Sequence, residues 1–326
     1  MPIIEVSTYK APPYLFNGHM QTIFPHFFRP KRDLHRFEDR IDTADGDFLD
    51  LDWYFPRDVY EAGRPLVIIS HGLEGSSRRG YVLAMVNTLK KAGYDVLAWN
   101  YRGCSGRANR KIYSYHSGKT EDLEHVIEYA LDYRHYKDIS LVGFSLGGNI
   151  TLKYLGEQTN KVPPEINHGV AISAPVDLRS SAEELALPQN RIYLKRFLEG
   201  LYGKILEKNE MFPGQLRIVD IKNIKDFKDF DDLYTAPLNG FADAYDYWKQ
   251  CSSLHKLANI EIPTLLLNAV NDSFLGAGCY PCEQAKNSEY LYLEMPETGG
   301  HTGFYYPDDR GIYWSEKRVL SFLGRR

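Results

Sequence analysis

The chain has 326 residues, of which 43% are hydrophobic and 25% charged, so it can form one large or two ordinary globular units. A formal net charge of −4 leaves no cationic surplus for phosphates, which argues against nucleic acid as a partner, and no apolar run is long enough to span a bilayer. The N-terminus lacks the pattern of a secretory signal, and four cysteines are too few for a disulfide-built scaffold. We therefore expect free thiols and a cytoplasmic location.

From about residue 36 to residue 177, short β-branched runs alternate with longer amphipathic stretches, which is typical of parallel strands joined by helices. The expected strands, each ending at or next to Gly, Pro or a polar residue, are residues 48–55, 66–70, 95–100, 139–142 and 169–173. Residues 81–92 and 120–133 carry apolar residues at helical spacing and are the expected crossover helices. The sequence thus predicts an α/β fold, with a mostly parallel central sheet and helices on both faces.

Residues 178–255 interrupt the strand pattern and carry helical patterns around residues 183–187 and 192–206. Beyond them, two further strands and a terminal helix are expected at residues 263–268, 290–294 and 317–323. Because the strand pattern resumes, we predict a single domain over residues 1–326 with an inserted helical cap at 178–255. Residues 1–35 are expected to form an N-terminal strap.

The segment Gly143-Phe-Ser145-Leu-Gly147 is a G-x-S-x-G motif, placed directly after a predicted strand and at the start of a helical stretch. In a nucleophile elbow the serine occupies a sharp, strained turn, and the flanking glycines let the strand and helix backbones approach without Cβ clashes. This context predicts Ser145 as a nucleophile. The alternative is a glycine-rich turn that binds a phosphate or only packs.

A nucleophilic serine needs a base, and an acid that orients the base; in α/β-hydrolases they follow in the order Ser, acid, His. Asp272 ends an apolar strand and is the first candidate for the acid, while Asp177, which follows the preceding strand, is its competitor. His301 lies on a glycine-flanked loop and is the predicted base, because no other histidine follows Asp272. Four histidines in polar surroundings are expected at the surface: His116, His125, His135 and His255.

An oxyanion hole needs the backbone N–H after the nucleophile and a second N–H from the loop after the third strand. Leu146 supplies the first, and Leu73 is the predicted second donor. Gly72, in the same loop as Leu73, allows the backbone to turn its N–H groups inward. His71 is expected to orient this loop rather than to act as the base, because it has the wrong place in the chain order.

Two other clusters resemble metal sites but are incomplete. Cys279 and Cys282 form a C-x-x-C that lacks the second pair of a zinc site. Four aspartates without the glycine and terminal Glu of a calcium loop are expected in a solvated charged segment: Asp226, Asp229, Asp231 and Asp232. The sequence therefore predicts neither a metal nor a cofactor.

Besides the G-x-S-x-G segment, four stretches are distinctive: residues 12–22 (PPYLFNGHMQT), 71–75 (HGLEG), 100–104 (NYRGC) and 230–241 (FDDLYTAPLNGF). With these motifs the sequence resembles, over nearly its whole length, the YheT-like branch of the α/β-hydrolases, which is related to eukaryotic abhydrolase-domain lipases and fungal medium-chain ethyl ester synthases. The resemblance implies a triad of Ser145, Asp272 and His301 and hydrolysis of carboxylic esters, such as those of short- or medium-chain acylglycerols.

The first of these stretches contains Asn17-Gly-His19, which is equally compatible with a packed strap over the sheet and with a part of the active site. Eukaryotic relatives often carry an N-terminal membrane anchor, whereas this chain begins almost directly at that motif, which favours a cytosolic location. The predicted function is a serine esterase that acts on a small-molecule ester through an acyl-enzyme. Two alternatives are an acyltransferase that uses the same acyl-enzyme and a catalytically silent ligand-binding fold, against which the intact triad residues argue.

Overall fold

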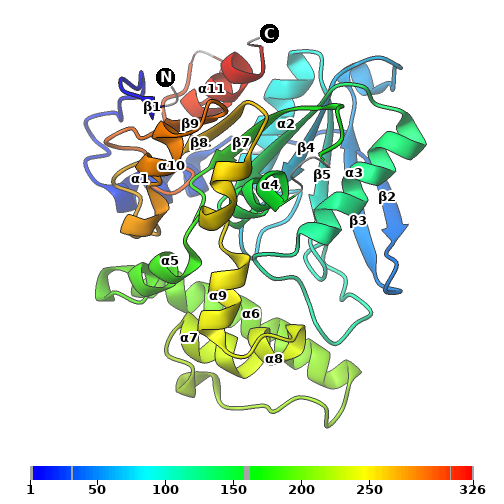
Figure 1. Ribbon diagram of the computed structural model, residues 1–326, viewed down its shortest axis with the longest axis vertical. Coiled ribbons are helices and arrows are strands. Elements are labelled where there is room, and N and C mark those ends of the chain that lie inside the picture. The colour runs from blue at the N-terminus through cyan, green and yellow to red at the C-terminus, as the bar shows by residue number, and fades with distance from the viewer. Residues whose placement is uncertain (1–2, 31, 158–161, 309, 325–326) are drawn as a thin grey trace.

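The computed structural model describes residues 3–30, 32–157, 162–308 and 310–324. These residues form a nine-stranded sheet in the order β1-β9-β8-β7-β6-β4-β5-β3-β2 (Figure 1). The strands are β1 (Ile3–Ile4), β2 (Phe37–Asp42), β3 (Phe48–Tyr54), β4 (Leu66–Ser70), β5 (Asp95–Asn100), β6 (Ile139–Phe144), β7 (Ile166–Ile172), β8 (Thr264–Leu267) and β9 (Leu291–Glu294). β3 runs antiparallel to both β2 and β5, and the other neighbouring pairs are parallel. The predicted mostly parallel sheet is confirmed.

Helices connect the strands and build a separate layer. They are α1 (Gly18–Phe28), α2 (Gly80–Lys91), α3 (Thr120–Arg134), α4 (Leu146–Glu157), α5 (Leu178–Leu185), α6 (Arg191–Met211), α7 (Phe227–Phe230), α8 (Ala236–Asn239), α9 (Ala244–Cys251), α10 (Cys282–Lys286) and α11 (Trp314–Leu323). A π-helical segment, Asp231–Thr235, joins α7 to α8.

The core has one apolar cluster on each face of the sheet, because successive side chains of a strand point to opposite faces. In β4, Ile68 belongs to the cluster that includes α3 and α4, whereas Val67 and Ile69 belong to the cluster that includes α2 and α11. All five residues of β4 are buried, as expected for a central strand covered on both faces. The predicted placement of helices on both faces is confirmed.

The structure also corrects the predicted element list. β1 and β2 were not expected, because β1 has two residues and β2 is an edge strand of mostly charged side chains. The helix α1 was not expected either, since its buried positions are occupied by Gln21 and Pro25 rather than by large apolar residues. The helical pattern predicted for residues 183–187 belongs to α5, which begins earlier because Asp177 caps it by accepting a hydrogen bond from Ser180 N.

Between β7 and β8 the chain leaves the sheet and forms α5 to α9, which lie together beyond one end of the sheet, opposite the chain termini (Figure 1). These helices share a third apolar cluster with Phe274, which includes aromatic residues such as Phe227, Phe230, Tyr247 and Trp248. The predicted insertion at 178–255 contains all five helices. The pocket described below lies between this layer and the carboxyl ends of the strands.

Candidate active site

Ser145 occupies a sharp turn between β6 and α4, with a positive φ of 53°. Such a left-handed conformation is strained for serine and holds its side chain away from both flanking elements. The turn depends on the glycines of the motif: a Cβ on Gly143 would lie 2.2 Å from the oxygen of Gly147, and a Cβ on Gly147 would lie 2.3 Å from the oxygen of Ser70. The G-x-S-x-G pattern therefore follows from the close approach of β4, β6 and α4.

Three predicted site residues from distant parts of the chain form a continuous hydrogen-bonded series. Ser145 Oγ lies 2.9 Å from His301 Nε2, and His301 Nδ1 lies 2.9 Å and 3.1 Å from the two carboxylate oxygens of Asp272. A carboxylate accepts from the Nδ1–H, so this pair favours the tautomer whose Nε2 can accept the serine proton. The arrangement is suited to removing the proton from Ser145.

The two candidate acids have different surroundings. Asp272 is 3% exposed, and one of its carboxylate oxygens accepts a further hydrogen bond from Phe274 N at 2.9 Å. Asp177 accepts from Ser180 N as the cap of α5, and no hydrogen bond or ion pair joins it to a histidine within the described residues. Of the two, the structure brings Asp272 to His301.

Phe274 is a site residue that the sequence analysis missed. Its ring stacks on the imidazole of His301 with centroids 4.1 Å apart and planes 22° apart. This contact covers one face of the base and limits its rotation. A signal was present in the sequence, since Phe274 follows Asp272 by two residues, but nothing in the pattern indicates that its ring turns toward His301.

Helix α1 contacts the loops that carry Asp272 and His301. The side-chain oxygen of Gln21 accepts from Asn271 Nδ2 at 3.0 Å and from Gly299 N at 2.7 Å, so it joins the two loops. Thr22 Oγ1 accepts from His301 N at 2.8 Å. Helix α1 therefore has a polar inner face that contacts both loops. Of the motif whose place was open in the sequence, Asn17 caps this helix by accepting a hydrogen bond from Met20 N at 2.8 Å.

We expect Thr22→Val to lower kcat toward a soluble ester by about tenfold with little change in KM, because the His301 N–H loses its acceptor and the base loses a support. Thr22→Ser, which restores the hydroxyl, is expected to recover most of the activity. Steady-state kinetics of the three proteins checks this. Equal kcat values for Thr22→Val and wild type would show that this hydrogen bond does not position the base.

His71 is buried, and burial lowers its pKa to about 3, so the imidazole is neutral at physiological pH. Its Nδ1 donates to the oxygen of Gly72 at 2.8 Å, while its Nε2 accepts from Tyr101 N at 3.3 Å. Both ring nitrogens are therefore engaged with the backbone. These contacts agree with a role in shaping the loop after β4, and they leave no nitrogen of His71 free to act on a substrate.

Two backbone N–H groups next to Ser145 lack protein acceptors. Among the residues that the structure describes, the N–H groups of Leu73 and Leu146 form no hydrogen bond, whereas the neighbouring Gly72 N–H donates to Tyr81 Oη at 2.9 Å. Leu146 is the first residue of α4, where unsatisfied N–H groups and the helix dipole favour negative charge. These two donors have the properties that an oxyanion hole requires.

The loop that carries Leu73 is connected to the α5–α9 layer through Glu74. One carboxylate oxygen of Glu74 accepts from Tyr115 Oη at 2.7 Å and from Lys204 Nζ of α6 at 2.6 Å. The Glu74 backbone N–H also donates to Tyr115 Oη at 3.0 Å. The position of the loop thus depends on a contact between the sheet and the α5–α9 layer.

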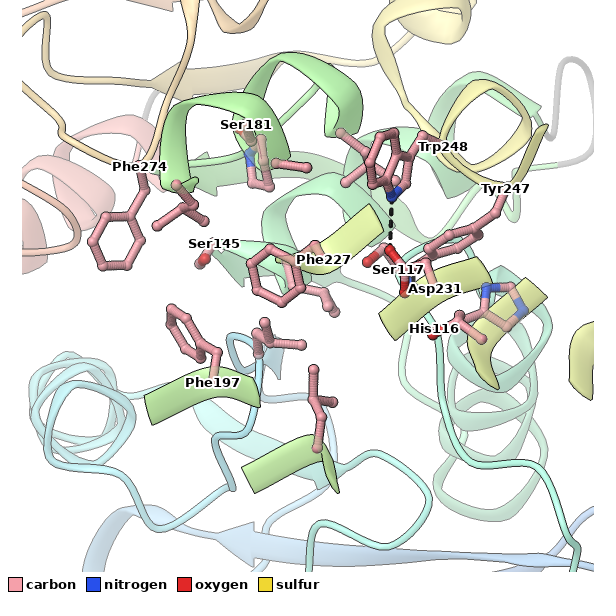
Figure 2. Close-up of a pocket in the computed structure, with 18 of the residues that line it drawn as sticks. His116, Ser117, Ser145, Ser181, Phe197, Phe227, Asp231, Tyr247, Trp248 and Phe274 are labelled. Carbon is pink, nitrogen blue, oxygen red and sulfur yellow. Dashed lines mark hydrogen bonds between the residues drawn. The ribbon is translucent and has the colours of Figure 1, made fainter. Parts of the chain in front are cut away.

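A pocket with an empty volume of about 790 Å³ extends from Ser145 into the α5–α9 layer (Figure 2). Beside Ser145 and His301 its wall is mostly apolar and includes Leu178, Ala182, Leu185, Phe197, Leu201 and Phe227. Figure 2 shows Phe197, Phe227 and Phe274 on the Ser145 side of the cavity. An apolar pocket with a few convergent polar groups is typical of a small-molecule site.

The far end of the pocket is polar. Two of its residues, Asp231 and His116, differ from the surface positions predicted for them. Asp231 is buried rather than solvated: it accepts from Trp248 Nε1 at 2.8 Å, as the dashed line in Figure 2 shows. His116, expected at the surface, lines the same end, and burial lowers its pKa to about 3. The prediction for Asp231 was wrong, and His116 is half-buried rather than fully at the surface. The local sequence of both residues is polar, and their neighbours Trp248 and Tyr247 come from the distant helix α9.

The buried Asp231 should make stability depend on pH. Burial raises its pKa from 3.8 to about 7, so between these values the folded state holds a proton that the unfolded state has released. Stability therefore falls as pH rises through this window. We expect Asp231→Asn, which does not titrate and keeps an acceptor for Trp248, to gain on the order of 5 °C in Tm relative to wild type between about pH 5 and pH 8. Thermal unfolding at both pH values checks this, and a pH-independent difference in Tm would contradict it.

Comparison with known proteins agrees with this geometry. Residues 65–215 match the family model described as "alpha/beta hydrolase fold". The chain is 33% identical over 314 residues to the Escherichia coli protein named "Putative esterase YheT", covering 94% of this chain and 90% of that protein. The chain belongs to the YheT-like branch of the α/β-hydrolases. The α/β-hydrolase fold predicted from the sequence is thereby confirmed.

Two further relatives extend the comparison of this YheT-like hydrolase. The phospholipase ABHD3 of Mus musculus is 28% identical over 306 residues, covering 92% of this chain and 74% of that protein. Among solved structures, the Pyrococcus furiosus esterase Pf2001 superposes with a TM-score of 0.57 over 90% of this chain and 93% of that chain, at 19% identity. The second similarity supports the fold alone.

Other predicted features of this YheT-like hydrolase can be located. Cys279 Sγ lies 3.5 Å from the oxygen of Asp177, and Cys282 Sγ lies 3.9 Å from Met295 Sδ, so the two thiols have separate partners. Within the described part of the chain, no three His, Cys, Asp or Glu side chains gather as a metal set. All four cysteines are free. No helix in the same part of the chain is long and apolar enough to cross a membrane.

Proposed function

We propose that the protein is a serine esterase that cleaves carboxylic esters through an acyl-enzyme on Ser145. The observation that carries the proposal is the hydrogen-bonded series Ser145–His301–Asp272 at the entrance of an apolar pocket. Ser145 Oγ attacks the ester carbonyl while His301 Nε2 takes its proton, and Asp272 stabilises the imidazolium that forms. The proton then passes from His301 to the leaving alkoxide, which departs as the alcohol.

The negative charge that develops on the carbonyl oxygen is stabilised by the N–H groups of Leu73 and Leu146, which have no protein acceptor among the described residues. In the second half-reaction, His301 removes a proton from water, and the resulting hydroxide attacks the acyl-enzyme. Collapse of the second tetrahedral intermediate releases the carboxylic acid and returns the proton to Ser145. No step requires a metal or a redox group.

The proposed substrates are esters with short- or medium-chain acyl groups, including acylglycerols. In this proposal the acyl chain lies along the apolar wall between Ser145 and Phe227 and points toward the polar groups around Asp231. The names of the relatives, "Putative esterase YheT" and "Phospholipase ABHD3", support an ester or a lipid as the class of substrate. In this proposal residues 178–255 are a cap that forms the acyl pocket within a single domain, since α6 also holds the loop of Leu73 through Lys204 and Glu74.

Turnover of p-nitrophenyl esters of increasing acyl length tests the proposal. We expect activity that depends on Ser145, with an optimum at short or medium chains, because the apolar wall ends at the polar groups around Asp231. A parallel series with an added alcohol detects a new ester, which would make acyl transfer the better description. Absence of turnover with every chain length would contradict the esterase proposal and favour a ligand-binding role for the fold.

A further inference from the structure

Helix α1 has the reverse of the usual amphipathic pattern. Its inner face presents Gln21 and Thr22 to the loops of the site. The rest of the helix and Phe16, just before its N-cap, leave four large apolar side chains exposed, by 39% to 77%: Phe16, Ile23, Phe27 and Phe28. A surface helix of a globular protein normally turns its apolar face to the core. We therefore expect these exposed side chains of α1 to contact a molecule other than the described part of this chain.

The beginning of α6 continues this surface. The His19 ring of α1 stacks on Tyr193 of α6 with centroids 5.7 Å apart, and Arg196 Nη1 lies 3.5 Å from His26 Nε2, so the two helices are neighbours. Ile192, next to Tyr193, is 79% exposed. We define the rim patch as Phe16, Ile23, Phe27, Phe28 and Ile192.

The rim patch lies next to the catalytic site. The Tyr193 ring packs against Phe274 with centroids 4.7 Å apart, and Phe274 in turn stacks on His301. Phe274 and His301 both line the pocket. A hydrophobic substrate that reaches the rim patch is therefore separated from the proposed base by two aromatic rings.

Uncompensated positive charge flanks the rim patch. Burial lowers the pKa of His26, on the last turn of α1, and the positive charges of Arg196 and Arg79 lower it further. Within the described residues, neither arginine forms an ion pair with a carboxylate, and Arg191, beside Ile192, forms none either. This local excess of cations contrasts with the net charge of −4 of the whole chain.

We propose that the rim patch docks the protein onto an anionic lipid surface, from which an ester lipid enters the pocket. Exposed aromatic and aliphatic side chains enter the boundary between headgroups and acyl chains, and arginines beside them are attracted to anionic headgroups. The arginines beside the rim patch favour an anionic lipid surface over a neutral one. That the lipid is an ester follows from the proposed esterase function, on which this part of the inference rests.

Co-sedimentation with vesicles tests the docking independently of catalysis, because Ser145→Ala can serve as the background in every binding assay. The probes are vesicles of phosphatidylcholine alone and of equal parts phosphatidylcholine and phosphatidylglycerol. We expect binding to the mixed vesicles that weakens by at least about tenfold in Phe27→Glu/Ile192→Glu. Arg196→Gln should weaken binding to the mixed vesicles by about fivefold and leave binding to the neutral ones unchanged.

The matched control is Val59→Glu/Tyr133→Glu, which adds the same charge at exposed apolar residues away from the rim patch and should bind like the parent. With Ser145 intact, Phe27→Glu/Ile192→Glu should retain turnover of p-nitrophenyl acetate, which shows that the site is folded. Failure to bind mixed vesicles, or equal loss in the control, would overturn the docking while leaving the esterase proposal standing. Sedimentation velocity detects a dimer. A dimer that Phe27→Glu/Ile192→Glu disrupts and the control does not would show that the rim patch binds a second copy of the chain rather than lipid.

Discussion

Ser145→Ala is expected to lower kcat/KM toward soluble esters by at least about 10⁴-fold while leaving the fold intact. The substitution removes the atom that is to form the acyl-enzyme, and the remaining donors and pocket cannot replace a covalent nucleophile. Burst and steady-state kinetics with a p-nitrophenyl ester measure the effect, and circular dichroism checks the fold. Alanine tolerates the positive φ of 53° no worse than serine does, so a stability change is not expected to complicate the result.

Retention of more than about a tenth of the wild-type activity in Ser145→Ala would contradict the mechanism. The background activity of adventitious basic side chains can be subtracted with the double variant Ser145→Ala/His301→Ala. If the two residues act as one unit, the double variant should be about as inactive as Ser145→Ala alone, because their effects on a shared step are not additive. A further large loss in the double variant would show that His301 acts on its own.

Asp272→Asn is expected to lower kcat by about 10³- to 10⁴-fold with a small change in KM. The carboxylate accepts from His301 Nδ1 at 2.9 Å, and an amide that donates in its place would favour the tautomer in which Nε2 carries the proton. That tautomer cannot accept a proton from Ser145. Steady-state kinetics over a range of pH measures the loss.

Asp177→Asn is the matched control, because it makes the same chemical change one strand away. Asparagine also caps helices well, so α5 should keep its start and the variant should retain most of the activity. If Asp177→Asn cost as much activity as Asp272→Asn, the choice of acid made from the sequence and supported by the hydrogen bonds would be wrong.

The sheet could be predicted closely because its central strands are continuous apolar runs with polar or glycine ends. The bounds of β4 and β5 agree with the predicted residues 66–70 and 95–100. The polar residues after such strands converge on one edge of a parallel sheet. The positions of Ser145 and Asp272 at this edge could therefore be predicted from the sequence. The sequence does not predict β2 or α1, because β2 is mostly charged and the buried positions of α1 are Gln21 and Pro25 rather than large apolar residues.

The surroundings of the candidate site were less predictable, because they arise from contacts between segments far apart in the sequence. Thr22 reaches His301 across 279 positions, and nothing local to either residue indicates that contact. The burial of Asp231 depends in the same way on the packing of α5–α9, although its own sequence resembles an ordinary solvated segment. Periodicity predicts which face of an element is apolar, but not what covers a polar residue.

The most direct test of the account is to identify the residue that a fluorophosphonate labels. We expect one adduct, on the tryptic peptide of residues 138–153, with fragment ions that place it on Ser145 rather than on Ser140. The adduct should be absent from Ser145→Ala and slower to form in Asp272→Asn, because attack on phosphorus uses the same base and the same acid. Labelling of another serine, or a wild-type protein that remains unlabelled while it hydrolyses esters, would contradict an acyl-enzyme on Ser145.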